Sequence, residues 1–342
     1  MVRFRVPFFD DYSWSVWIES LSGELTPEMI AIADRYEDRF RTRIAWGPAQ
    51  AKLTALARVF SIYDLQGLSA EQPVKGVYFL ATGRLSEQLE FLTAFPEVRT
   101  FAISNEFPPW SRQDSATLKA LSDFEVHHLT LNGAPRASHL NGIRNDLQSL
   151  SLEINGAGYW GEILDAPWPN LRTLKFVGSD KGTARVLGER LDTFATILPQ
   201  VDELDLFQTS AAPPLLEALS TSPWVATLRG LRIDNGSFKT DRIASIADVP
   251  FERLEYLGTN AKATAKTAQA LAASPHLKTV RSLEIIGQVK RKGIAAILDA
   301  WPNLAHIALW DTPHYTDVEA VIDAYDLSAF VRAGGVVEAR IC

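Results

Sequence analysis

The stretch Leu147-Gln-Ser-Leu-Ser-Leu-Glu-Ile-Asn155 carries apolar residues at its first, fourth and sixth positions. The same apolar-x-x-apolar-x-apolar triplet returns about every 25 residues along most of the 342-residue chain. Ten units align on the first apolar position, at Val74, Val98, Val126, Leu147, Leu171, Val201, Leu228, Phe251, Val280 and Leu304. A repeat of this length is typical of a solenoid, in which no unit buries its apolar side without its neighbours.

Each unit contains the signals of a strand, a turn and a helix. Residues 171–176 alternate apolar and polar side chains, which predicts a half-buried strand. Residues 183–198 and 294–301 place apolar side chains every three or four positions, as an amphipathic helix does. Prolines punctuate the helix ends, and we expect the tryptophans next to several of them to fill the core: Trp168, Trp224 and Trp301. Such units stack their strands in parallel and keep their helices on one side.

This pattern resembles the leucine-rich repeat proteins, in particular the ribonuclease-inhibitor-like subclass. Residues 147–155 fit the family's L-x-x-L-x-L-x-x-N pattern, and the resemblance covers about 74–332. It implies an α/β solenoid with a parallel β-sheet on the concave face and helices on the convex face. The chain departs from the family at the ninth position of each unit, where only Asn155 supplies the preferred asparagine. We therefore expect irregular repeats with a patchy interior ladder of side-chain hydrogen bonds.

The two ends of the chain depart from the repeat. Residues 1–70 show no repeat and are predicted to form a small α+β capping subdomain, with helices over 30–44 and 49–62. Residues 71–342 then form the solenoid of about ten units. Its C-terminal cap is predicted over 316–342, with a helix that begins at a capping box and a last edge strand after Gly335.

Composition limits the kinds of function. The net charge is −7, whereas nucleic-acid-binding proteins usually carry a basic surface, so no nucleic-acid partner is expected. The single cysteine, Cys342, allows no intrachain disulfide, which fits a reducing compartment. No apolar run approaches the length of a membrane span or a signal-peptide core, so we expect a cytoplasmic protein without a membrane partner.

The sequence contains no catalytic motif that we recognise. A phosphate-binding loop, a nucleophile elbow and a zinc-binding H-E-x-x-H motif are all missing from it. The six histidines are scattered, and the adjacent His127 and His128 should point to opposite faces of a strand. We therefore predict no catalytic residue, no metal site and no cofactor.

The concave face of the predicted sheet is the candidate site. Since side chains alternate along a strand, positions three, five and seven of each unit should face away from the core. The predicted partner-binding residues are Tyr78, Glu153, Lys175, Glu203, Asp205, Phe207, Arg232, Asp234, Glu255, Glu284 and Trp310. Four of them, Lys175, Asp205, Arg232 and Glu255, would alternate in sign along the fifth position. Such a row can equally be a self-compensating ladder that steadies the sheet, with each exposed pair worth about 0–1 kcal/mol.

These observations favour a non-enzymatic protein–protein interaction module. The surplus of acid and the apolar side chains at the seventh position suit a protein or peptide partner with basic and apolar anchors. Two alternatives remain open at this stage. Residues 1–70 can carry an enzymatic or effector activity for which the repeats give specificity, or the chain can be a structural subunit of an oligomer.

Overall fold

The computed structural model describes sixteen segments of the chain. They are residues 41–42, 57–61, 76–80, 89–90, 93, 98–104, 118–132, 137–153, 167–177, 189–191, 193–207, 213–234, 242–260, 265–286, 289–310 and 318–340. These segments fall into two compact units with a boundary between Arg172 and Thr173. We call them the N-terminal unit and the C-terminal unit.

The N-terminal unit contains six short parallel strands. They are β1 (Arg41–Thr42), β2 (Ala57–Ser61), β3 (Gly76–Leu80), β4 (Thr100–Ser104), β5 (His128–Asn132) and β6 (Ser149–Glu153). Each strand pairs with the next one in the chain. The 3-10 helices η2 (Leu121–Asp123) and η3 (Ala137–Ile143) lie in the connections between strands. The order and direction of these strands confirm the repeat register that begins at Val74, Val98, Val126 and Leu147.

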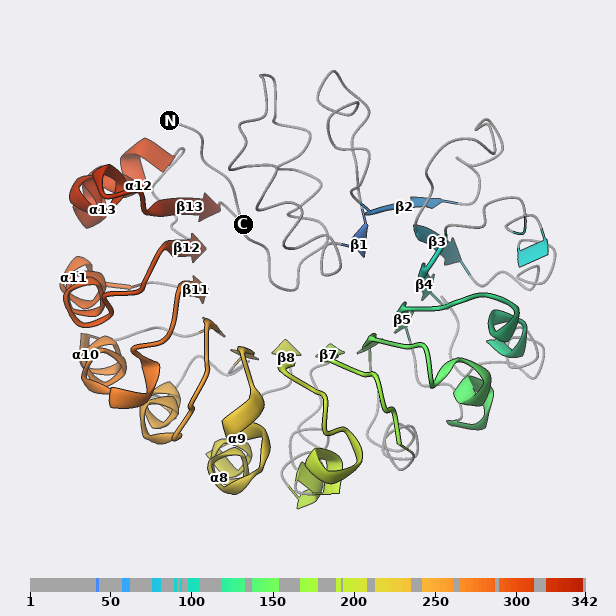
Figure 1. Ribbon diagram of the computed structural model, residues 1–342. Coiled ribbons are helices and arrows are strands. Elements are labelled where there is room, and N and C mark those ends of the chain that lie inside the picture. Colours follow the sequence, from blue (N-terminus) through green and yellow to red (C-terminus); the bar gives the residue numbers. More distant parts are fainter. Residues whose placement is uncertain are drawn as a thin grey trace. The chain divides into compact units, whose positions relative to one another are not determined.

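The C-terminal unit continues the same pattern with clearer helices (Figure 1). Its strands are β7 (Thr173–Val177), β8 (Glu203–Phe207), β9 (Gly230–Asp234), β10 (Tyr256–Asn260), β11 (Ser282–Ile286), β12 (His306–Trp310) and β13 (Val336–Arg340). All pair in parallel with the next strand. Its helical elements are α8 (Pro213–Thr221), α9 (Trp224–Thr227), η4 (Arg242–Asp248), α10 (Ala265–Ala273), η5 (Pro275–Leu277), α11 (Arg291–Ala300), α12 (Val318–Tyr325) and α13 (Ser328–Arg332). The predicted edge strand near the C-terminus is thus confirmed as β13.

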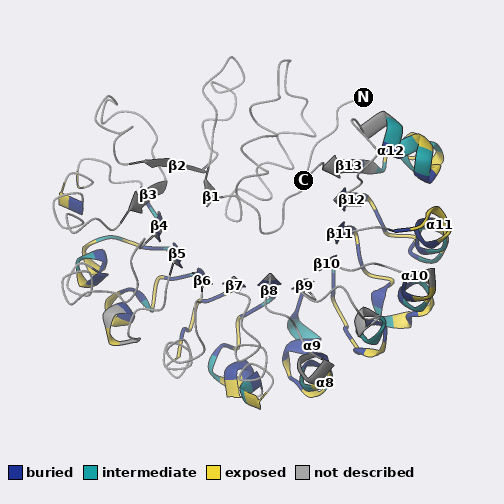
Figure 2. Ribbon diagram, turned by 180° about the vertical axis from the view of Figure 1, so that it is seen from behind, coloured by how far each residue is buried: buried dark blue, intermediate teal, exposed yellow. Residues whose placement is uncertain are grey.

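The core of the C-terminal unit lies between the strands and the helices (Figure 2). One lateral row of core residues runs through Leu204, Leu231, Leu257, Leu283 and Ile307, which are all buried. Burying each such side chain stabilises the fold by about 1.5–3 kcal/mol. Trp224 and Trp301 are also buried, as is Trp168 in the N-terminal unit, which confirms the prediction that they fill the core.

Polar side chains tie successive repeats together at the turn that enters each strand. In the C-terminal unit, Asn303 Nδ2 donates to the carbonyl of Lys278 at 3.0 Å, and Thr279 Oγ1 donates to that of Leu254 at 2.8 Å. The hydroxyl of Ser274 bonds to the carbonyl of Ala247 in the same way. Each bond gives a backbone carbonyl of one repeat a partner from the next repeat, which matters most where the carbonyl is shielded from water. Of the ninth positions, where the ladder is expected, only Thr259 belongs to the described residues, and its pairing with Ile233 and Ile285 makes it a core position instead.

Two predicted segments differ from the structure near the N-terminus. Arg41–Thr42 and Ala57–Ser61 are strands, so the helices predicted over 30–44 and 49–62 are wrong at these residues. The pairing of β2 with β3 explains this difference. Hydrogen bonds to a neighbouring strand stabilise an extended segment even where the local sequence pattern favours a helix. The parallel sheet therefore begins before residue 71, while the rest of the predicted cap lies outside the described residues.

A second difference is the register of β10. The sequence favoured a unit starting at Phe251, whereas the pairing of Leu257 with Leu231 and Leu283 makes Leu254 the first apolar position. In this register the first, fourth and sixth positions are Leu254, Leu257 and Thr259. Because Thr259 is polar, the unit does not match the apolar triplet that marks the other repeats. Leu257, expected as an exposed apolar residue at the seventh position, is fully buried in the core.

Candidate interaction surface

The candidate surface is the face of the sheet opposite the helices, which we call the inner face. Residues three and five of each unit share this face because side chains alternate along a strand. In the C-terminal unit the fifth positions of β7 to β11 lie in register as Lys175, Asp205, Arg232, Gly258 and Glu284. The register confirms three residues of the predicted row, Lys175, Asp205 and Arg232, and Gly258 takes the place predicted for Glu255.

Charged side chains of this row bond laterally across the strands. Lys175 Nζ lies 3.7 Å from Asp205 Oδ2, and Arg232 Nη1 lies 3.8 Å from the same oxygen. Arg232 Nη2 donates to Glu284 Oε1 at 3.0 Å, and Tyr256 Oη donates to Glu284 Oε2 at 2.6 Å. We call these five residues the charge network. Its alternating signs support the reading of the row as a ladder that steadies the sheet.

Gly258 allows the network to skip a strand. Arg232 on β9 reaches Glu284 on β11, so its side chain must cross β10, and neighbouring strands are about 4.8 Å apart. A Cβ at Gly258 would lie 2.9 Å from Arg232 Cγ and 2.5 Å from Tyr256 Oη. Both distances are shorter than carbon contacts allow, so any other residue would displace the arginine, the tyrosine or the strand.

The inner face is buried at this network, contrary to the prediction of an exposed surface. The exposed fractions are 2% for Glu203, 0% for Asp205, 4% for Arg232 and 4% for Glu284. Alternation along a strand reveals which face a side chain takes, but not whether that face is covered, so the sequence could not show this burial. Lys175 is more exposed than the other charges at the fifth positions of β7, β8, β9 and β11, with 22% of its side chain exposed.

Burial also determines the protonation of Tyr256. Desolvation raises the pKa of its phenol well above 10, and the neighbouring Glu284 carboxylate raises it further. The phenol therefore remains a neutral hydrogen-bond donor to Glu284 at physiological pH. A carboxylate that accepts from both an arginine and a tyrosine has partners for both of its oxygens, which is what burial of this charge requires.

The third positions of the same strands carry a second set of polar contacts. Thr173 Oγ1 donates to Glu203 Oε2 at 3.2 Å, and Ser282 Oγ shares a hydrogen bond of 2.7 Å with His306 Nδ1. A serine beside a histidine is the start of a nucleophilic pair. Both residues are buried, with exposed fractions of 6% and 4%, so the hydroxyl does not face solvent where a substrate would arrive. These contacts instead join adjacent strands.

Glu255 lies at the edge of the sheet and outside the fifth-position row. It precedes β10, and both of its carboxylate oxygens accept from Arg229 Nη2, at 3.0 and 2.8 Å. The hydrogen bond to Glu255 raises the pKa of Arg229, although partial burial opposes this effect. Its predicted place between Arg232 and Glu284 was wrong because the register of β10 differs by three residues.

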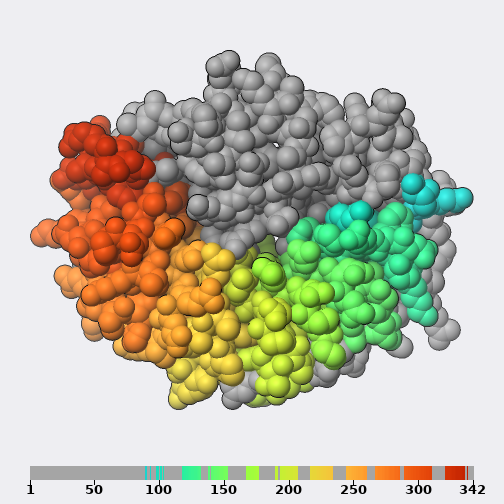
Figure 3. Space-filling view, viewed as in Figure 1, coloured from blue at the N-terminus to red at the C-terminus, as the bar shows by residue number. Residues whose placement is uncertain are grey.

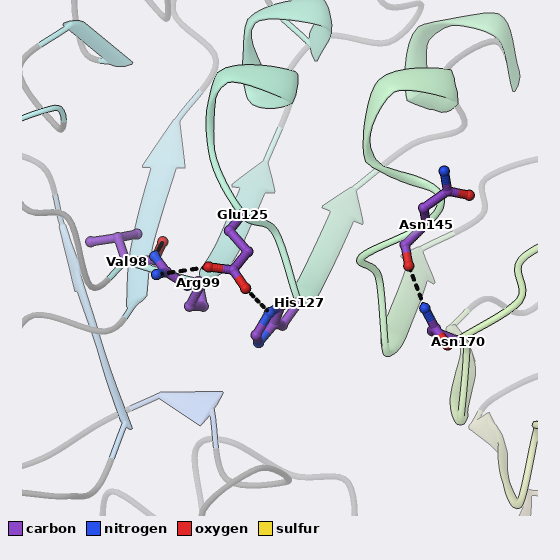
Figure 4. A network of polar contacts seen from close by, with 6 residues as sticks. All are labelled: Val98, Arg99, Glu125, His127, Asn145 and Asn170. Carbon is purple, nitrogen blue, oxygen red and sulfur yellow. Dashed lines mark hydrogen bonds and ion pairs between the residues drawn. The ribbon is translucent and has the colours of Figure 1, made fainter.

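In the N-terminal unit, polar contacts gather where the chain enters the strands (Figure 4). Glu125 accepts from Arg99 Nη2 at 2.9 Å, and its other oxygen lies 3.1 Å from His127 Nε2. Arg99 Nη1 also donates to the carbonyl of Val98. His127 thus pairs with a carboxylate, and in the part of the chain that the structure describes no cluster of three or more histidine, cysteine or acidic residues suits a metal ion.

The remaining predicted residues are placed by strand register. Tyr78 pairs with Ala102, and both lie at the fifth position of their repeat units. Glu153, Phe207, Asp234 and Trp310 are the last residues of β6, β8, β9 and β12. In the C-terminal unit this last position forms a lateral row, which we call the strand-end row: Val177, Phe207, Asp234, Asn260, Ile286, Trp310 and Arg340.

Comparison with known proteins bears on the fold. No protein-family description matches the sequence, and a search of curated proteins finds no similar chain. Among solved structures, a chain of the yeast complex titled "Crystal structure of Rad7 and Elc1 complex in yeast" is similar, with a TM-score of 0.51 and 13% identity over 96% of this chain and 92% of that one. The fold is a leucine-rich-repeat-like α/β solenoid. At this identity the likeness concerns the fold alone.

Tyr256 and Gly258 are the two members of the site that sequence reasoning missed. A signal for them exists in the spacing of the repeats. If the unit starts at Leu254, it lies 26 residues after Leu228 and 26 before Val280, instead of the uneven 23 and 29 given by Phe251.

The described helices include none that is long and apolar enough to cross a membrane.

Proposed function

We propose that this chain is a non-enzymatic protein-interaction module of the ribonuclease-inhibitor-like kind. Its strand-end row, with Phe207, Asp234 and Trp310 as the main contacts, would bind a protein or peptide partner. The observation that supports this proposal is the shared register of β7 to β13, which brings one residue from each repeat into a single line. In the N-terminal unit the candidates are Glu153, the last residue of β6, and Tyr78, at the fifth position of its unit.

The chemistry of the strand-end row indicates the partner. The row combines aromatic and aliphatic residues with one carboxylate among its central members, at Asp234. Aromatic residues supply most of the binding energy in protein interfaces, and a carboxylate selects a basic group by charge. A segment with an apolar anchor and a lysine or arginine fits this combination. The similar solved structure is by its title a complex of Rad7 and Elc1, which agrees with such a role.

The charge network lies on the same strands as the strand-end row and would hold these strands in place. Arg232 and Glu284 fix the lateral spacing of β9, β10 and β11, so the last residues of these strands need little reorganisation on binding. This division of roles revises the prediction that every inner-face charge contacts the partner. Glu203, Asp205, Arg232 and Glu284 would hold the sheet, whereas the strand-end row would make the contacts.

The test is capture of binding partners by the full chain and by a variant with Phe207→Ala, Asp234→Ala and Trp310→Ala. Loss of aromatic anchors costs about 2 kcal/mol or more each at an interface, so the variant should lose the specifically captured protein. Gln269→Ala, an exposed site on α10, is the matched control. Circular dichroism confirms that each variant folds. Equal capture by the triple variant and the control would rule out the strand-end row.

A further inference from the structure

One region of this acidic chain is strongly basic. Between Leu257 and Leu298 the sequence holds seven lysines and arginines: Lys262, Lys266, Lys278, Arg281, Lys290, Arg291 and Lys292. The same stretch holds a single acid, Glu284, which is buried and bonded to Arg232. The local charge is therefore +6 within a chain of −7. Such an asymmetry is a property of the surface, because six of the seven cations are described and all six are exposed.

The fold gathers four of these cations at one edge of two adjacent repeats. Helices α10 and α11 both follow parallel strands, so they begin at the same edge of the C-terminal unit. They pack closely, since a Cβ at Gly293 would lie only 2.7 Å from the Cβ of Ala268. Lys266 lies in the first turn of α10, and Lys290, Arg291 and Lys292 lie at the start of α11. We call these four residues the basic surface; the α10 and α11 region is the orange part of Figure 3.

Local stability does not explain this placement. The start of a helix carries a partial positive charge, so cations there are unfavourable by a few tenths of a kcal/mol each. Lys290 takes the N-cap position of α11 without a side-chain hydrogen bond. Arg291 Nη2 pairs with Asp326 Oδ2 at 2.5 Å, and both side chains are more than half exposed. For the three lysines of the basic surface, no ion pair with another described residue occurs.

We propose that the basic surface binds an acidic segment of a protein partner. This inference goes beyond the proposed function, because it concerns the starts of α10 and α11 instead of the strand ends, and a partner segment of the opposite charge. Packed helices lie about 8–10 Å apart, so the distance between the two helix starts is about the length of three extended residues. A short run of aspartate and glutamate matches this span. A longer polyanion such as a nucleic acid would extend over the rest of the chain, which carries the balance of −13.

The test measures binding of a fluorescent peptide of about eight glutamates to the full chain by anisotropy. Lys290→Glu with Lys292→Glu should weaken binding about tenfold, because two attractive pairs become repulsive. Lys278→Glu with Arg281→Glu is the matched control, since it changes the same charge by the same amount on exposed residues at the opposite, strand-entering edge of the same repeats. The control should change the affinity less than about twofold. Binding should also weaken as salt rises.

Three outcomes would overturn the proposal. They are no measurable binding of the peptide, an equal loss in the control variant, and tighter binding of an oligonucleotide or an anionic vesicle of equal charge that the same lysines control. A glutamine peptide of equal length should not bind. The Phe207→Ala and Trp310→Ala variant should bind the glutamate peptide as the unmodified chain does. This result separates a failure here from a failure of the strand-end row.

Discussion

Two arginine–glutamate pairs of the C-terminal unit have nearly the same geometry and opposite surroundings. Arg229 and Glu255 lie 2.8 Å apart with side chains 35% and 41% exposed. Arg232 and Glu284 lie 3.0 Å apart with side chains 4% and 6% exposed. Distance alone would rank them as equals. Burial gives the two pairs different effects on stability. When one partner of a buried pair is removed, the remaining charge has neither a partner nor solvent, whereas water solvates the remaining charge of an exposed pair.

The largest expected effect comes from removing the buried carboxylate. Glu284→Ala takes away the group that both Arg232 Nη2 and Tyr256 Oη bond. The free energy of unfolding should fall by about 3–5 kcal/mol, as for other broken buried pairs. Urea denaturation of the full chain measures this change. A loss below about 1 kcal/mol would show that the pair behaves like an exposed one.

A smaller loss is expected at the glycine beneath the pair. Gly258→Ala places a Cβ against Arg232 Cγ and Tyr256 Oη, which should cost about 1–3 kcal/mol of unfolding free energy. The reason is the crossing arginine, so the cost should shrink when Arg232→Ala, which removes the clashing Cγ, is already present. A double-mutant cycle in urea measures this coupling. Additive effects of the two substitutions would contradict the crossing.

The contrast between the pairs was only partly predictable from the sequence. The alternation in residues 171–176 and the spacing of the leucines predicted parallel strands, and the buried tryptophans followed from their position beside prolines. The row of fifth-position charges was also predicted, except at β10. In that strand Thr259 occupies a core position, and the apolar Phe251 made the unit appear to begin three residues too early. The closure of the inner face is a tertiary property, and no periodicity in the sequence encodes it.

Tyr256 tests whether burial governs the network at alkaline pH. Tyr256→Phe should lower the free energy of unfolding by about 1–2 kcal/mol, because it removes one hydrogen bond to a charged group. The pKa of Tyr256 is raised in the folded state, so the folded protein holds this proton after the unfolded chain has released it near pH 10. Stability from this residue is therefore full below pH 10 and falls as the pH rises above it.

Urea midpoints between pH 9 and pH 11 for both proteins measure this slope. The Phe variant should lose less stability over that range than the unmodified chain. Parallel curves for the two proteins would show that the phenol is not the group responsible.

The smallest effect is expected at the exposed pair. Glu255→Ala should change the free energy of unfolding by about 0–1 kcal/mol, because water replaces the lost contact to Arg229. Any loss should fade at high salt, where exposed charges are screened. Thermal melting in low and high salt measures both quantities. A loss as large as that of Glu284→Ala would remove the distinction between the two pairs.

The bond from Arg232 to Glu284 has a consequence for how the unit opens. Solenoid energetics are ordinarily written as a sum over single repeats and adjacent interfaces, which lets one repeat fray without the one beyond its neighbour. Here a side chain on β9 is fastened to β11, 52 residues later, across an intervening strand. The three repeats thus share a second-neighbour coupling, and amide hydrogens of β9, β10 and β11 should exchange in one common event rather than one strand at a time.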